Sequence, residues 1–235
     1  MFVGHAAVAL AVRSRTQGVS LGWLVAAAFA LDLVWPVFLL LGIEQVSIVP
    51  GATAFNPLVF DYYPWSHSLL MACFWALCAA VAARWRGMSN RIAIVIAAVV
   101  ISHWILDWIS HIPDLPLWPG HSPLLGVGLW NSVSATFLVE GTIFLIGIAM
   151  YVRSSRALDR IGSIGFWAFV LVCAALWLSS PWSPPPPSAQ ALAWFSLGGW
   201  LLVAWAGWSD LHRIVFAEVR RSTSPYTRER GRGEN

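Results

Sequence analysis

Long apolar stretches separated by short polar segments run along nearly the whole chain. Since about 20 apolar residues cross a bilayer as a helix, the pattern predicts an all-α fold, a polytopic transmembrane bundle of about seven helices. The predicted helices cover residues 2–17, 19–41, 65–86, 91–111, 129–152, 161–179 and 189–210. At about 1.5 Å per residue the first one reaches only roughly 24 Å, so we expect it to be a short crossing or a re-entrant helix.

The same pattern predicts one transmembrane helical domain over residues 1–219, followed by a disordered cytoplasmic tail over residues 220–235, which is polar and rich in arginine. Composition agrees with a membrane protein, because 58% of the residues are hydrophobic and only 11% are charged. All fourteen basic residues are arginine, which excludes a retinal Schiff base and any lysine nucleophile.

The arginines lie beside the ends of apolar stretches, a position that indicates membrane topology and not nucleic-acid binding. They occupy every second connection between predicted helices, whereas the other connections carry only Glu44, Asp61 and Asp114 as charges. The arginines of these connections are Arg13, Arg15, Arg84, Arg86, Arg91, Arg153, Arg156 and Arg160. By the positive-inside rule the chain is a multi-pass membrane protein with a cytoplasmic C-terminus, in contact with membrane lipids. We expect the membrane to be a bacterial-type inner membrane. The pattern leaves the oligomeric state open.

Candidate chemistry is densest between Ser102 and Asp114, at the end of the fourth predicted helix. His103, Asp107 and His111 are spaced i, i+4 and i+8, which stacks two imidazoles and a carboxylate on one helix face. Imidazole nitrogens and carboxylate oxygens are ordinary ligands of zinc, with manganese and magnesium as alternatives. Ionisable groups within a membrane helix are costly and mark a functional interior.

Ionisable residues of other predicted helices lie at a similar depth, in the outer half of the membrane. The candidate metal ligands are therefore His5, Asp32, His67, His103, Asp107 and His111. Glu140 and Asp32 are the candidate catalytic bases, because a desolvated carboxylate can act near neutral pH. Each of these residues also has a purely structural interpretation, as a hydrogen-bonding group inside the bundle.

These residues occur in an order that resembles a known family. Gly4-His5, Leu31-Asp32, Ser66-His67-Ser68 and the His-x-x-x-Asp helix beginning at His103 are similar to the YdjM-like inner-membrane proteins, described as predicted metal-dependent hydrolases. The resemblance covers roughly residues 1–115. It implies that His5, Asp32, His67, His103 and Asp107 are metal ligands or their immediate partners. The sequence Asp61-Tyr62-Tyr63-Pro64-Trp65 stands where the family has His-Arg-Gly, and a second acid after Asp32 is absent.

Three functions fit this pattern. The first is a metal-dependent hydrolase with its site in the outer half of the membrane, acting on a lipid phosphoester or ester. The second is a non-enzymatic membrane subunit whose buried acids are structural, and the third is a metal or proton transporter. We rank the hydrolase first, the structural subunit second and the transporter third. The transporter comes last because the sequence has no inverted repeat and no pair of broken helices, which many transporters have.

Overall fold

The computed structural model describes residues 1–216 as a bundle of helices, which confirms the all-α prediction. The helices are α1 (Phe2–Arg13), α2 (Leu21–Ala28), α3 (Ala30–Leu40), α4 (Pro64–His67), α5 (Leu69–Trp85), α6 (Asn90–Ser110), α7 (Val133–Ser154), α8 (Phe166–Ser179), α9 (Ala189–Ser196) and α10 (Gly199–Leu211), with short turns η1 (Leu129–Asn131), η2 (Ile161–Gly165) and η3 (Ser180–Trp182). Residues 217–219 of the predicted domain and the predicted disordered tail lie outside the described residues.

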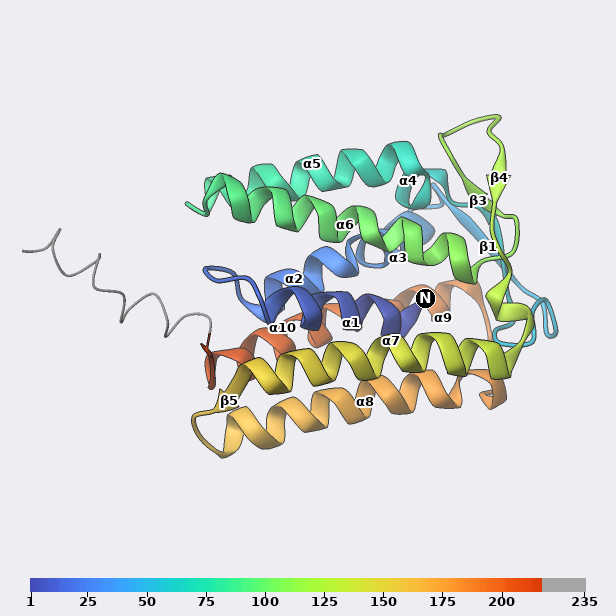
Figure 1. The fold of residues 1–235 in the computed structure, drawn as a ribbon. Coiled ribbons are helices and arrows are strands. Elements are labelled where there is room, and N and C mark those ends of the chain that lie inside the picture. Colours follow the sequence, from blue (N-terminus) through green and yellow to red (C-terminus); the bar gives the residue numbers. More distant parts are fainter. Residues whose placement is uncertain (217–235) are drawn as a thin grey trace, which may run out of the picture.

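Three antiparallel two-stranded sheets join the helices. They pair β1 (Gln45–Ile48) with β2 (Leu58–Tyr62), β3 (Leu115–Pro116) with β4 (Leu124–Leu125), and β5 (Ser155–Ala157) with β6 (Arg213–Val215). The first two occupy segments that the sequence predicted as loops, and they gather at one end of the bundle, with β5 at the other end (Figure 1).

Within residues 1–216, four segments are long and apolar enough to cross a membrane: α6, α7, Ile161–Trp182 and Ala189–Leu211. The pair α2 and α3 makes a fifth if it is taken as one span, bent by 56°. This bend corrects the prediction of one continuous helix over residues 19–41. Because α1 and α5 have only 12 and 17 residues, the number seven stays a prediction.

Serine side chains begin most of the long helices. In α5, α6 and α7 the serine that precedes the helix, respectively Ser68, Ser89 and Ser132, accepts a hydrogen bond from the backbone N–H three residues on. An N-cap of this kind satisfies a donor that the helix leaves free. The cap at Ser68 explains why the helix predicted over residues 65–86 is divided into α4 and α5.

Helix α1 lies in the middle of the bundle. Figure 1 shows α5 and α6 on one side of it and α7 and α8 on the other, with α2 and α10 beside it. Its contact with α7 is close because residue 147 is glycine: a Cβ there would lie 2.6 Å from the carbonyl oxygen of Ala7. This packing holds α1, and therefore His5, tightly inside the bundle.

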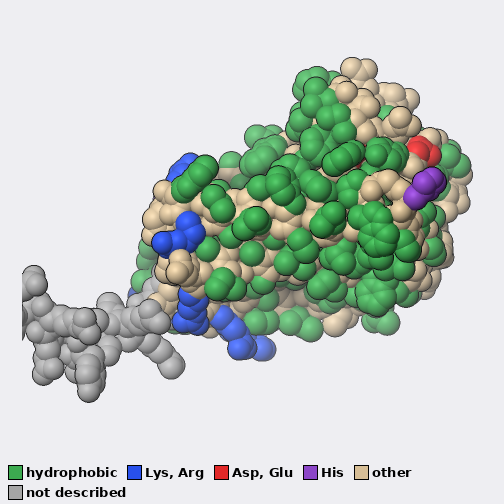
Figure 2. Space-filling model, turned by 90° about the horizontal axis from the view of Figure 1, so that it is seen from above, with side chains coloured by type: hydrophobic (Ala, Val, Ile, Leu, Met, Phe, Trp, Pro, Cys, Tyr) green, Lys and Arg blue, Asp and Glu red, His purple; other side chains and the backbone are tan. Residues whose placement is uncertain are grey.

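The two ends of the molecule differ in charge. Figure 2 shows arginine side chains gathered at one end, an acidic side chain and a histidine at the other, and a largely hydrophobic surface between them. The arginine end is also held by a buried network, in which Asp210 accepts hydrogen bonds from Arg13 Nε at 2.9 Å, from the Tyr151 hydroxyl at 2.5 Å and from the Leu21 N–H at 2.9 Å. The charge distribution agrees with the arginine pattern from which the cytoplasmic side was predicted.

Candidate metal centre

Four helices place ionisable side chains around one point in the bundle. His5 comes from α1, Asp32 from α3, His67 from the end of α4, and His103 and Asp107 from α6. The side chain of Asp32 is 40% exposed, whereas those of the other four are at most 4% exposed. The structure thus brings together five of the six residues predicted as ligands, and of these five only Asp32 lies partly at the surface.

The orientation of His103 is set by the bend between α2 and α3. Its Nδ1 lies 2.7 Å from the carbonyl oxygen of Ala28, the last residue of α2. Because a carbonyl oxygen only accepts hydrogen bonds, Nδ1 carries the hydrogen and Nε2 of the neutral ring has a free lone pair. This Nε2 is buried and lies 2.9 Å from Asp107 Oδ2 without the alignment of a hydrogen bond.

His67 is oriented by a second chain of contacts. Its Nδ1 lies 2.7 Å from Ser66 Oγ, which in turn lies 2.6 Å from Oε2 of the buried Glu44. Its Nε2 faces the centre, 3.4 Å from Asp32 Oδ1 and 3.9 Å from Asp107 Oδ2. From the sequence, Glu44 is only a charge in a connection between helices, because nothing in the local pattern signals that it is buried near His67.

Asp107 uses its two carboxylate oxygens on different sides. Oδ2 faces His103 and His67, while Oδ1 lies 3.1 Å from His5 Nε2 and 2.6 Å from the Met1 amino group. The rings of His5 and His103 are stacked, with centroids 3.7 Å apart and planes 6° from parallel. Asp107 therefore joins α1 to the ligand atoms of α4 and α6.

Two overlapping groups of three residues could hold a metal ion: His5, His103 and Asp107, and Asp32, His67 and His103. Four donor atoms of these residues face one another closely. The four atoms are His67 Nε2, His103 Nε2, Asp32 Oδ1 and Asp107 Oδ2, and four of their mutual separations are 3.4, 3.9, 3.8 and 2.9 Å. Ligand bonds of about 2.0–2.1 Å at tetrahedral angles put donor atoms about 3.3–3.4 Å apart. Two neutral imidazoles and two carboxylates are also a common donor set for zinc.

His111 does not join this group. Helix α6 ends at Ser110, and His111 is already in an extended conformation, with φ −68° and ψ 150°. Its Nδ1 lies 3.0 Å from Asp114 Oδ1, beside the hydroxyl of Tyr63. The predicted i, i+4, i+8 alignment therefore holds for His103 and Asp107 but not for His111, because the helix stops one residue too early.

Glu140 is buried on α7, which packs against α1. Its Oε1 accepts a long hydrogen bond of 3.4 Å from the Trp130 indole, and its Oε2 has no hydrogen-bond partner among the described residues. Its charge interacts with that of the Met1 amino group, which is bound to Asp107, and Glu140 is not a member of either group of possible metal ligands.

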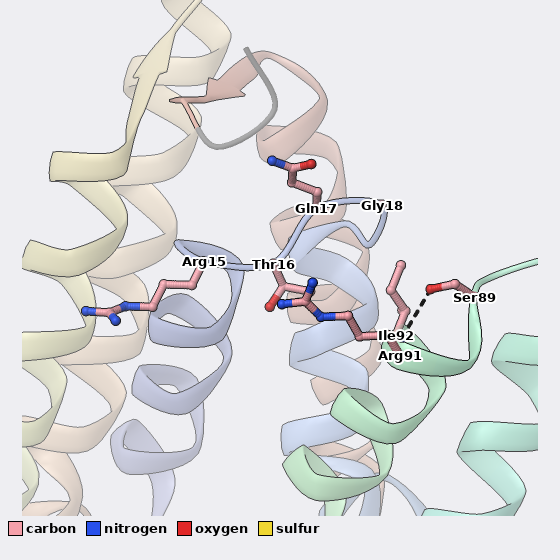
Figure 3. A pocket seen from close by; sticks show the side chains of 7 residues that line it. All are labelled: Arg15, Thr16, Gln17, Gly18, Ser89, Arg91 and Ile92. Atoms are coloured by element: carbon pink, nitrogen blue, oxygen red, sulfur yellow. Dashed lines mark hydrogen bonds between the residues drawn. The ribbon is translucent and has the colours of Figure 1, made fainter. Parts of the chain in front are cut away.

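A hollow of about 390 Å³ lies elsewhere, at the arginine end. It is lined by Arg15, Thr16, Gln17, Gly18, Ser89, Arg91 and Ile92. Figure 3 shows Arg91 extending toward Thr16 while Arg15 points away to the opposite side. Because the two guanidinium groups do not converge, this hollow has no built anion site, and the candidate chemistry stays with the cluster of His5, Asp32, His67, His103 and Asp107.

The chain was compared with protein-family models, curated proteins and solved structures. No family model, no curated protein and no solved structure matches the chain. The similarity to the YdjM-like proteins stays a prediction from the sequence, and the function has to be argued from the site itself.

Proposed function

We propose that this chain is an integral membrane metal-dependent hydrolase whose site is formed by His67, His103, Asp32 and Asp107. The observation that carries the proposal is the arrangement of the two histidines. Each has its Nδ1 committed to an oxygen outside the cluster and its Nε2 turned toward the two carboxylates. A second contact that orients a ligating imidazole is a regular feature of protein metal sites.

The resemblance to the YdjM-like family supports the same assignment. The residues that carry it are distant in sequence, yet they form the two overlapping groups of possible metal ligands in the bundle. When bound, a divalent ion of this kind, which we expect to be zinc, polarises a substrate oxygen and makes water more acidic. His5 holds Asp107 from the other side, and we expect substrate and water to reach the site at Asp32, its partly exposed member.

Glu140 is the proposed general base. Its Oε2 is buried and unpartnered among residues 1–216, so it is free to accept a proton from water. Because this carboxylate lies beside the cluster and outside the donor set, its removal is expected to affect turnover more than metal binding.

A lipid substrate is supported by the surroundings of the site. A hollow of about 400 Å³ is lined largely by apolar side chains, among them Phe2, Trp177 and Phe195. Phe2 contacts the ring of Phe29 at 5.6 Å between centroids, and Phe29 contacts His5 at the same distance. An acyl chain in this hollow would lie two ring contacts away from His5, a residue of the cluster.

The test is hydrolysis by purified protein in detergent, with phosphoester and ester lipids as substrates and with zinc or manganese added. Wild type and the control His121→Ala, a change in an exposed loop, should release product, while chelator and His103→Ala should abolish the release. Wild-type protein that contains metal but hydrolyses none of these lipids would contradict the hydrolase proposal.

The bend between α2 and α3 favours a second candidate, transport of a metal ion or a proton. Discontinuous helices often place ion-binding groups inside transporters, and Asp32 follows the bend directly. Metal-loaded vesicles distinguish the two functions, because a transporter moves the ion across the membrane without consuming lipid.

A further inference from the structure

The carboxylate of Glu44 is an unusual group for its position. Glu44 lies in the connection between α3 and β1, a position where charged side chains are usually exposed. It is nevertheless only 2% exposed. A buried carboxylate is costly unless hydrogen-bond donors surround it. Here the donors are the backbone N–H of Ser66, 2.8 Å from Oε1, and the hydroxyl of Ser66, 2.6 Å from Oε2.

These contacts determine where the hydrogens lie along the series Glu44, Ser66 and His67, which we call the relay. Ser66 has one hydroxyl hydrogen, and the oxygens that face it are Glu44 Oε2 at 2.6 Å and the Tyr63 carbonyl oxygen at 3.3 Å. The ionised Glu44 accepts it, because its contact is the shorter one and a carboxylate has no hydrogen to give. The Ser66 oxygen then accepts from the nitrogen it faces at 2.7 Å, Nδ1 of His67. His67 is thereby held with its hydrogen on Nδ1 and its lone pair on Nε2, which faces Asp32 and Asp107.

We propose that Glu44 is a positioning residue that acts through Ser66 to keep His67 in the tautomer able to bind the metal. This inference rests on the proposed function, because it assigns Glu44 a role only if a metal occupies the site. It leaves Glu44 outside the donor set, two hydrogen bonds away from the ion.

A merely structural role for Glu44 is also conceivable, because its contact with the Ser66 N–H caps the first turn of α4. Glutamine separates the two roles. Its amide oxygen can still accept from the Ser66 N–H, but its NH₂ group donates to Ser66 Oγ, so the serine hydroxyl turns its hydrogen toward His67 Nδ1. The hydrogen of His67 is then displaced to Nε2, where it blocks the metal. The contact of residue 44 with the Ser66 N–H therefore survives this change, whereas the direction of the hydrogen bonds from residue 44 to His67 is reversed.

The experiment compares wild type with Glu44→Gln, Ser66→Ala and the control Asp61→Asn, which makes the same kind of carboxylate-to-amide change at an exposed position of β2. Each purified full-length protein is stripped of metal and titrated in detergent with zinc against a competing chelator. Cobalt absorption serves as a signature of the ligand set, and thermal unfolding of the metal-free protein reports on the fold.

We expect Glu44→Gln to weaken zinc binding by about 10–100-fold and to change the cobalt spectrum, without lowering the unfolding temperature of the metal-free protein. Ser66→Ala keeps the contact of Glu44 with the backbone N–H but removes the link to His67, so it should weaken zinc binding as well. Asp61→Asn should behave like wild type.

Unchanged zinc affinity and an unchanged cobalt spectrum in Glu44→Gln and Ser66→Ala would overturn the relay while leaving the metal site intact. A loss of affinity that is matched by a lower unfolding temperature in both variants would show a structural cap instead. Wild-type protein that binds neither zinc nor cobalt would overturn the proposed function, and the relay with it.

Discussion

His103 donates its Nδ1–H to the carbonyl oxygen of Ala28 over 2.7 Å. In a continuous helix this carbonyl would accept from the N–H of Asp32, four residues later. The bend at Phe29 leaves it to His103 and directs Asp32 into the cluster. One local interruption of a helix therefore orients one ligand and supplies another.

The first prediction concerns protons. The two imidazoles can bind a cation only through unprotonated Nε2 atoms, so protons compete with the metal for the site. Zinc affinity should fall as the pH is lowered into the range where the imidazoles take up protons, and zinc binding at that acidic pH should release them. Calorimetric titrations in buffers of different ionisation enthalpy measure this release, and binding heats that do not depend on the buffer would contradict the assignment of the histidines.

The second prediction separates binding from turnover. Glu140→Gln keeps the size of a buried side chain but removes the proposed base, so the turnover rate should fall by about 10²–10⁴-fold. Metal content should stay at the wild-type level because Glu140 does not belong to the donor set. The two quantities are measured on the same preparation, and full activity in the variant would exclude Glu140 as the base.

The third prediction concerns the stability of the metal-free protein as a function of pH. Burial raises the pKa of the Glu44 carboxyl above its usual value, although the hydrogen bonds from Ser66 oppose the shift. A raised pKa in the folded state means that Glu44 contributes most to stability below its ordinary pKa, and that this contribution is lost as the pH rises through the raised value. Glu44→Gln should therefore be at least as stable as wild type at pH 7 and lose this advantage at acidic pH. Thermal unfolding across this range measures the difference, and a variant that is less stable at pH 7 but not at acidic pH would contradict it.

The fourth prediction concerns the arginine end. Asp210 is buried and faces Arg13, Tyr151 and the N–H of Leu21, so it joins α1, α2, α7 and α10. Asp210→Asn removes the negative charge beside a buried guanidinium, which typically lowers stability by about 3–5 kcal/mol. Denaturation in detergent should show this loss, while metal bound per folded molecule should not change. An equal loss of metal per folded molecule would mean that the two ends of the bundle are coupled.

Much of the site could be predicted from the sequence because helix spacing and depth are simple to calculate. The i, i+4 pair of His103 and Asp107 follows from helical geometry, and the arginine pattern placed Asp32, His67 and His5 at a similar height. The direction in which each side chain points around its helix axis, relative to the other helices, does not follow from spacing and depth. That five side chains point inward toward each other depends on how four helices pack, including the close contact at Gly147.

The residues that sequence reasoning missed act through long-range contacts. Glu44 stands in a connection without a local signal of burial, and the Ala28 carbonyl becomes available only because the chain bends at Phe29. The pairing of Arg13 with Asp210 joins segments nearly at opposite ends of the described chain. His111 illustrates the reverse case, since a helix that ends one residue earlier than predicted turns its side chain toward Asp114.

The most direct test of a metal centre is the metal content of the purified protein, measured by inductively coupled plasma mass spectrometry. Wild type, the exposed-loop control His121→Ala and His103→Ala are compared after purification and again after reconstitution with zinc or manganese. We expect close to one divalent ion per chain in wild type and in the control, and a loss of that ion in His103→Ala. Absence of metal from wild type even after reconstitution would contradict the account, and the buried histidines and carboxylates would then be structural groups of a membrane bundle.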